Sequence, residues 1–237
     1  MLEFREITKK YGSKTAVDSV SLSIEPGRTY AMLGPNGSGK TTLMKMAVGL
    51  VKPNSGGCYY QGDPVGPKSR RDIAYMSTEP YFYSWMTARD IGKYYRDFFD
   101  DFSMEKYEFY LERMQLDCRQ KPKTMSSGMI AKLKVAVTMS RKARIYLLDE
   151  PLNGIDLLAR DQIMAAVKEA ASLDTAIVLS SHLVNELETI IDTAIFIKDS
   201  HLVKICHVEQ LSREQGKTVV DLYREIYGQG GNTAWEN

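Results

Sequence analysis

The sequence predicts an α/β protein with a mixed, mostly parallel sheet, an N-terminal antiparallel β-subdomain and an inserted α-helical subdomain. Apolar and polar residues alternate over Leu2–Thr8 and Ala16–Ile24, a pattern typical of antiparallel strands that bury one face. Short apolar strands alternate with helical segments in the second half of the chain, which indicates a parallel sheet. Aromatic residues at helical spacing predict a helical insertion over about residues 80–125.

A turn at Pro26-Gly27 leads into the first strand of the expected parallel sheet. Arg28–Leu33 is apolar enough to be buried, and it runs directly into a glycine-rich stretch. The other expected elements of this half are a helix over Thr41–Gly49 and short strands over Cys58–Gln61 and Ile73–Met76.

The expected helical insertion is rich in aromatic residues. Residues 81–110 hold 12 of the 23 aromatic side chains of the chain. One group follows helical spacing, and core packing is its simplest explanation. A second group is almost consecutive, so one element cannot easily bury all its members, and we hypothesise an exposed docking surface there. The first group is Tyr94, Tyr95, Phe98, Phe99 and Phe102, and the second is Tyr81, Phe82, Tyr83, Trp85 and Met86.

The second half contains four expected helices, two buried strands and a hairpin, which Asp199-Ser200 predicts. No internal repeat is visible, so we expect one domain over residues 1–205 that contains the insertion. A short C-terminal helical extension with a frayed tail is expected over 206–237. The helices are expected at Ser127–Lys142, Leu157–Ser172, Leu183–Ile191 and Lys217–Tyr227, the strands at Arg144–Leu148 and Ala176–Leu179, and the hairpin strands at Ala194–Lys198 and His201–Ile205.

The composition favours a globular cytosolic protein. The formal net charge is +1, with 31 basic and 30 acidic side chains, so no basic excess neutralises phosphates and no direct nucleic-acid partner is expected. Cys58, Cys118 and Cys206 lack metal-binding spacing and are expected as free thiols. Met1–Arg5 lacks the apolar core of a signal peptide, and no run of roughly 18 apolar residues occurs. We expect another chain to supply any membrane spans.

The segment Gly34-Pro35-Asn36-Gly37-Ser38-Gly39-Lys40-Thr41 fits the phosphate-loop pattern GxxxxGK(S/T). Its glycines let backbone N–H groups approach phosphate oxygens, and the positive end of the following helix faces the same anion. Lys40 supplies a charge for the β- and γ-phosphates, and the Thr41 hydroxyl can ligate Mg²⁺. We therefore expect a P-loop NTPase core that binds ATP and Mg²⁺. The candidate nucleotide-binding residues of this loop are Asn36, Gly37, Ser38, Gly39, Lys40, Thr41 and Thr42.

Two further candidates for catalysis follow buried strands, where ligands bind in parallel sheets. The strand ending at Leu148 is followed by Asp149, which is placed to hold Mg²⁺, and by Glu150, which can polarise the attacking water. His182 follows the next buried strand and can sense the γ-phosphate. Together with Lys40, Glu150 and His182 form the expected catalytic set. His201 and His207 have no such context.

The order of these motifs resembles the nucleotide-binding subunit of ABC transporters over about residues 1–205. Met125–Met129 stands where that family has its LSGGQ signature, and Asn153–Asp156 looks like its D-loop. The resemblance implies that Tyr11 stacks on adenine with Val17 beside it. It also implies a head-to-tail dimer, with itself or with a related ATPase subunit. In such a dimer Ser126, Ser127, Gly128 and Asp156 complete the ATP site of the other subunit.

Two departures from the family pattern concern the signature and the Q-loop. The signature has Ser127 where glycine is usual and Met129 where a polar residue is usual, although Ser126 and Gly128 remain to bind an anion. The Q-loop glutamine aligns with Thr78, which is too short to reach as glutamine does.

Within the family, Glu79–Met129 resembles exporter-type subunits of the ABC-2 class. The resemblance implies a chain peripheral to the cytoplasmic face of a membrane, with a separate transmembrane permease docked near Glu79–Met86. One alternative is a soluble ABC ATPase acting mechanically in DNA repair or translation, although no second ATP module, long coiled coil or zinc-binding cysteines are visible. Another is a non-hydrolysing regulatory subunit, against which Glu150 and His182 argue. A P-loop kinase would leave the signature helix unexplained.

Overall fold

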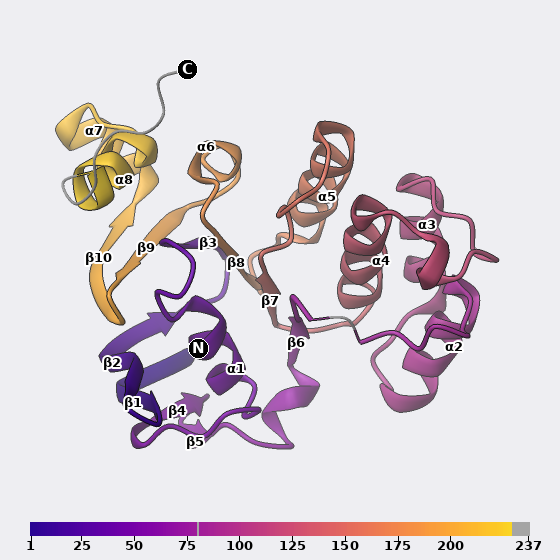
Figure 1. Cartoon of the computed structure of the whole chain (residues 1–237), viewed down its shortest axis with the longest axis horizontal. Coiled ribbons are helices and arrows are strands. Elements are labelled where there is room, and N and C mark those ends of the chain that lie inside the picture. Colours follow the sequence, from indigo (N-terminus) through magenta and orange to yellow (C-terminus); the bar gives the residue numbers. More distant parts are fainter. Residues whose placement is uncertain (80, 229–237) are drawn as a thin grey trace.

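A computed structural model describes residues 1–79 and 81–228 of the chain (Figure 1). Its strands form a four-stranded sheet in the order β2-β1-β4-β5 and a six-stranded sheet in the order β10-β9-β3-β8-β7-β6. The N-terminal sheet lies on one side of the six-stranded sheet, and the helical subdomain lies on the other (Figure 1). The predicted α/β class with its two subdomains is confirmed.

The N-terminal sheet is antiparallel, as the alternation of apolar and polar residues predicted. It consists of β1 (Leu2–Tyr11), β2 (Lys14–Ile24), β4 (Ser55–Tyr60) and the short β5 (Asp63–Pro64). Helix α1 (Lys40–Ala47) shares one apolar core with this sheet and with one face of the six-stranded sheet. This packing fixes the helix that follows the phosphate loop.

The six-stranded sheet is mixed and mostly parallel. Five strands run parallel, and β10 (His201–His207) pairs antiparallel with β9 (Thr193–Lys198). Asp199 and Ser200 join these two strands with positive φ angles of 48° and 71°, as a tight hairpin turn requires. The other strands are β3 (Arg28–Leu33), β6 (Ile73–Met76), β7 (Ile145–Asp149) and β8 (Ala176–Ser181).

The helical subdomain contains α2 (Ala88–Phe98), α3 (Met104–Arg113) and α4 (Ser127–Met139). A capping box between Thr87 and Asp90 begins α2. Helix α5 (Leu157–Ala170) packs on α4. Two 3₁₀ turns lie elsewhere in the chain, at Ser69–Arg71 and Pro122–Thr124. Among the described residues, no helix is long and apolar enough to cross a membrane.

The two aromatic groups of this subdomain differ partly from expectation. Tyr94, Tyr95, Phe99 and Phe102 pack against the core, but Phe98 is 67% exposed because it ends α2 on the outward side. In the second group, Tyr83 and Trp85 are 53% and 63% exposed. Met86 is buried and Phe82 packs against the core, since the chain turns between them. The hypothesised docking surface therefore contains fewer residues than the second group.

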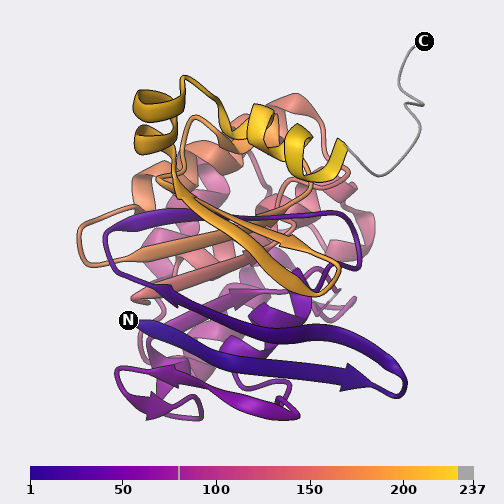
Figure 2. The same cartoon turned by 90° about the vertical axis from the view of Figure 1, so that its left-hand side faces the viewer.

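The C-terminal region also differs from the sequence-based expectation. The helix expected at Leu183–Ile191 is only α6 (Val184–Leu187), and α7 (Val208–Gln215) was not predicted. Helix α8 (Val219–Tyr227) lies within the expected Lys217–Tyr227. The β9–β10 hairpin lies between the N-terminal sheet and these last helices (Figure 2). The expected frayed tail beyond Gly228 lies outside the described residues.

Candidate active site

The phosphate loop joins the buried end of β3 to the first turn of α1. Gly39 precedes this helix with a φ of 114°, and a Cβ atom there would lie 2.4 Å from the Ala16 carbonyl oxygen. A glycine is therefore required at this position. Among the described residues no side chain caps the first amides of α1, so they remain available to an anion.

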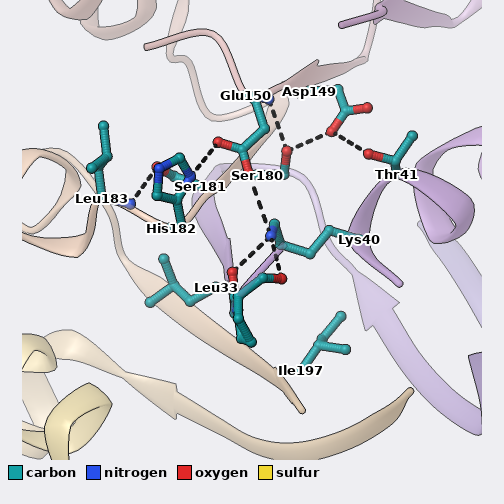
Figure 3. A network of polar contacts seen from close by, with 12 residues as sticks. Leu33, Lys40, Thr41, Asp149, Glu150, Ser180, Ser181, His182, Leu183 and Ile197 are labelled. Carbon is teal, nitrogen blue, oxygen red and sulfur yellow. Dashed lines mark hydrogen bonds and ion pairs between the residues drawn. The ribbon is translucent and has the colours of Figure 1, made fainter. Parts of the chain in front are cut away.

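The Lys40 side chain is buried at the centre of the loop (Figure 3). Its Nζ donates to the carbonyl oxygens of Gly34 at 2.7 Å and Pro35 at 3.2 Å. It also lies 3.3 Å from Glu150 Oε1, an ion-pair contact that does not meet hydrogen-bond geometry. Oε1 thus has no hydrogen-bond partner among the described residues although it is buried. A water molecule could satisfy this atom.

The two expected Mg²⁺ ligands lie together at the sheet edge. Thr41 Oγ1 donates to Asp149 Oδ1 at 3.1 Å, and Ser180 Oγ donates to the same atom at 2.7 Å (Figure 3). Tyr75 donates its hydroxyl to Asp149 Oδ2 at 3.3 Å. Burial, followed by the charge of Asp149, raises the pKa of Tyr75, so this hydroxyl stays a donor.

These oxygens fit an octahedral Mg²⁺. Neighbouring ligands at about 2.0–2.1 Å from the metal stand roughly 2.9 Å apart, close to the spacing of the Thr41 and Asp149 oxygens. Within residues 1–79 and 81–228, no group of three His, Cys, Asp or Glu side chains could hold a metal.

Glu150 and His182 meet beside Lys40. Glu150 has a φ of 49°, a left-handed conformation in which its side chain leaves the strand direction and separates from Asp149. The Glu150 amide donates to Ser180 Oγ at 2.9 Å, which holds this turn. His182 Nδ1 lies 3.0 Å from Glu150 Oε2 (Figure 3). The carboxylate is thus held between an imidazole and an ammonium group, with one oxygen free for water.

A cavity of about 400 Å³ opens over the phosphate loop, a size suited to a small ligand. Tyr11 stands at its mouth with its ring half exposed. Val17 and Ser38 are buried behind the loop and do not line the cavity, and Ser38 Oγ has no hydrogen-bond partner within the described chain. The cavity is lined by Tyr11, Lys14, Ala16, Asn36, Gly37, Gly39, Lys40, Thr41, Thr42, Thr78, Glu150 and Asn153.

The signature residues do not line this cavity. Ser126 begins α4 and accepts the Met129 amide at 3.2 Å, while the Ser127 hydroxyl donates to the Gly154 carbonyl oxygen at 3.0 Å. Gly128 faces the Asp156 carboxylate, which caps α5 by accepting the Ala159 amide at 2.9 Å. Within the described chain, therefore, the signature contacts the D-loop, and only Asn153 of these two motifs lines the cavity over the phosphate loop.

Sequence reasoning missed a buried lysine that fixes the Q-loop. Lys134 Nζ donates to three consecutive carbonyl oxygens, those of Ser77 at 3.0 Å, Thr78 at 2.8 Å and Glu79 at 2.9 Å. Burial lowers the pKa of Lys134, against the opposing charges of Asp149 and Glu79. The only available signal was a lysine on the apolar part of α4, between Leu133 and Val135.

Two more contacts complete the surroundings of the site. Lys45 of α1 pairs with Glu79 at 2.7 Å, so the Q-loop is held from α1 as well as from α4. Tyr75 and Ser180, which hold Asp149, were also missed. Ser180 directly precedes Ser181-His182 at the end of a buried strand, and this position was a usable signal.

Comparisons with known proteins identify the family of this chain. Residues 17–153 match the family model of ABC transporters. A lantibiotic transport ATP-binding protein of Streptococcus pyogenes, SrtF, is 30% identical over 205 residues, covering 86% of this chain and 89% of that protein.

Two solved structures have the same fold. The structure of an ATP-binding subunit of an ABC transporter has a TM-score of 0.85 at 24% identity, covering 95% of this chain and 99% of the other. A dimeric ATP-binding cassette in a post-hydrolysis state with ADP and Pi has a TM-score of 0.77 at 23% identity, covering 87% and 98%. At these identities the likeness concerns the fold alone. Since the family model matches more than half of its length, and a relative of 30% identity spans most of both sequences, the chain belongs to the ABC transporter family as an ATP-binding subunit that hydrolyses ATP.

Proposed function

We propose that this subunit hydrolyses MgATP at the interface of an ATPase dimer and so powers export through a separate transmembrane permease. The observation that carries the proposal is one network of contacts that joins Lys40, Thr41, Asp149, Glu150 and His182. Three of these residues, Lys40, Thr41 and Glu150, line the cavity over the phosphate loop. These five side chains supply each part that phosphoryl transfer to water requires: a phosphate clamp, metal ligands and a base.

The catalytic roles follow from the contacts. Lys40 exchanges its carbonyl partners at Gly34 and Pro35 for β- and γ-phosphate oxygens. Thr41 and Asp149 hold Mg²⁺, which neutralises charge on the phosphates when bound. Glu150 accepts a proton from the attacking water, and His182 keeps the carboxylate oriented through its contact with Oε2.

The dimer is proposed because the signature residues have no phosphate partner in their own chain. Ser126 and Ser127 are exposed at the N-terminal end of α4, a thirteen-residue helix whose positive end favours an anion. In a head-to-tail dimer, Ser126, Ser127 and Gly128 would approach the γ-phosphate bound to the partner's loop. The partner subunit is a second copy or a related ATPase.

The permease is proposed to dock next to Glu79–Met86, which would place the subunit on the cytoplasmic face of a membrane. Tyr83 and Trp85 stack with ring centroids 5.8 Å apart on the surface, and the Tyr83 ring contacts that of Tyr94 at 6.1 Å. Tyr94 and Glu79 line a neighbouring cavity of about 520 Å³. An exposed aromatic pair beside a hollow suits a short inserted element of another protein. Export is favoured by the resemblance to SrtF, which is named for lantibiotic transport.

Affinity purification from detergent-solubilised membranes tests this function. A polytopic membrane protein should co-purify and raise ATP turnover. The combined change Tyr83→Ala and Trp85→Ala should abolish co-purification and leave basal turnover intact. Phe109→Ala removes another exposed aromatic side chain of the helical subdomain and should change neither. Recovery only from the soluble fraction, alone or with ribosomes or DNA, would favour a soluble, mechanical or regulatory ABC ATPase.

A further inference from the structure

The C-terminal helix α8 contacts the strand that carries the phosphate loop. The Tyr227 hydroxyl lies 3.1 Å from the Leu33 carbonyl oxygen and 2.9 Å from that of Ile197. Leu33 is the last residue of β3 and directly precedes Gly34, and Ile197 is next to the last residue of the neighbouring strand β9. A single hydroxyl proton therefore bridges the two strand ends at the root of the phosphate loop.

The carbonyl groups that Tyr227 binds are next to the anchor of Lys40. A Cβ atom at Gly34 would lie 2.3 Å from the Ile197 oxygen, so the loop begins in direct contact with this carbonyl. The Gly34 carbonyl oxygen accepts the Lys40 ammonium at 2.7 Å. A shift of the Leu33 or Ile197 carbonyl would thus move the loop backbone that holds Lys40 in place.

Helix α8 is itself firmly anchored to the core. Val219 and Leu222 are buried, and the Val219 amide donates to Glu188 Oε1 at 2.6 Å. At its other end, Lys198 Nζ donates to the Ile226 carbonyl oxygen at 2.8 Å. The Tyr223 and Tyr227 rings are 4.3 Å apart. The helix therefore holds the Tyr227 hydroxyl in a fixed place.

Helix α8 also reaches the segment that follows His182. Glu188 follows α6, which begins two residues after His182. Helix α8 thus contacts both the strand end that precedes the phosphate loop of Lys40 and the segment that follows His182.

We propose that Tyr227 is a positioning residue of the ATP site, which sets the geometry of the phosphate loop through the Leu33 and Ile197 carbonyls. Helix α8, which lies in the expected C-terminal extension, then helps to shape the ATP site. The inference rests on ATP binding and hydrolysis by this chain and is independent of export.

Tyr227→Phe removes only the hydroxyl group and tests the proposal in the full-length chain. We expect the Kd for a fluorescent ATP analogue and the KM for ATP to rise about fivefold, the loss that one net hydrogen bond of about 1 kcal/mol gives. The kcat should change less than twofold. Tyr107→Phe is the matched control, since its hydroxyl donates to the Ala88 carbonyl oxygen at 2.7 Å inside the helical subdomain. It should leave Kd and KM unchanged.

Lys198→Met provides a second test that leaves Tyr227 in place. It removes the hydrogen bond to the Ile226 carbonyl oxygen and so releases the end of α8. Kd and KM should both rise, as in Tyr227→Phe. The proposal therefore stays testable if Tyr227→Phe does not fold. Unchanged Kd and KM in both variants, with active wild-type protein, would overturn the proposal. Equal changes in Tyr107→Phe would also overturn it. An inactive wild-type protein would instead contradict the ATPase assignment, so the two failures are distinguishable.

Discussion

Replacing Lys134 by methionine should destabilise the protein more than the same change at Lys132 of the same helix. Methionine fills most of the volume of the lysine stem but cannot donate hydrogen bonds. The carbonyl oxygens of Ser77, Thr78 and Glu79 would all lose the same partner, which now donates to them at 2.8–3.0 Å. Among the described residues, the side-chain contact between Lys45 and Glu79 would still hold the Q-loop.

The magnitude follows from two opposing terms. A hydrogen bond from a charged donor contributes about 1.5–3 kcal/mol, while burying an ammonium group costs several kcal/mol. Thr78 and Glu79 are exposed, so water can reach part of the freed loop. We expect the free energy of unfolding to fall by about 2–4 kcal/mol, between the value of one bond and that of a broken buried ion pair. For a chain of this size the melting temperature falls roughly 2–4 °C per kcal/mol, or about 4–16 °C in total.

Thermal denaturation monitored by circular dichroism measures this loss. Lys132→Met is the matched control, because Lys132 is on the same helix and donates to the Met114 carbonyl oxygen at 2.8 Å and to Gln162 Oε1 at 3.1 Å from a half-buried position. Its melting temperature should fall less than that of Lys134→Met, because Lys132 has two partners instead of three and water can replace them at this half-buried position. A Lys134→Met variant that melts no lower than Lys132→Met would refute the reasoning.

The remaining predictions concern ATP and the Q-loop. Lys40→Ala should weaken MgATP binding at least about 100-fold, because charged hydrogen bonds to phosphate are lost, and tight binding would contradict the phosphate-loop assignment. Gly39→Ala should weaken binding similarly, since its Cβ would lie 2.4 Å from the Ala16 carbonyl oxygen; an unchanged Kd in isothermal titration calorimetry would show that the loop tolerates this contact. Thr78→Gln should leave the Kd unchanged and alter the permease-stimulated turnover, and an unaltered rate would mean that the departure at this position is neutral.

Local signals predicted the elements that surround the phosphate loop. The bounds of β3 and β6 agree with the expected Arg28–Leu33 and Ile73–Met76, because apolar strands in a parallel sheet are continuous buried runs. Asp199-Ser200 located the hairpin because a two-residue turn needs residues that adopt positive φ. Asp149 and His182 could be located from the ends of their strands.

Non-local contacts explain what the sequence could not predict. Lys134 is more than fifty residues from the carbonyls that it binds, and Tyr227 is 194 residues from Leu33. Helix α7 has a single buried residue, Leu211, so no apolar periodicity in the sequence predicted this helix. Val184 and Leu187 of α6 pack against α8. This tertiary contact, and not the apolar spacing after His182, decides where the helix α6 ends.

The most direct test of the account is the effect of Glu150→Gln on turnover and assembly in the same sample. The amide keeps the size of the side chain and a contact to His182, but it cannot accept a proton from water. We predict that ATP turnover falls by about 10²–10⁴-fold, the usual contribution of a general base. The Kd for MgATP should stay close to that of the wild type, and light scattering should record a dimer in MgATP. Wild-type turnover by this variant would contradict the role of Glu150 and with it the proposed catalytic site.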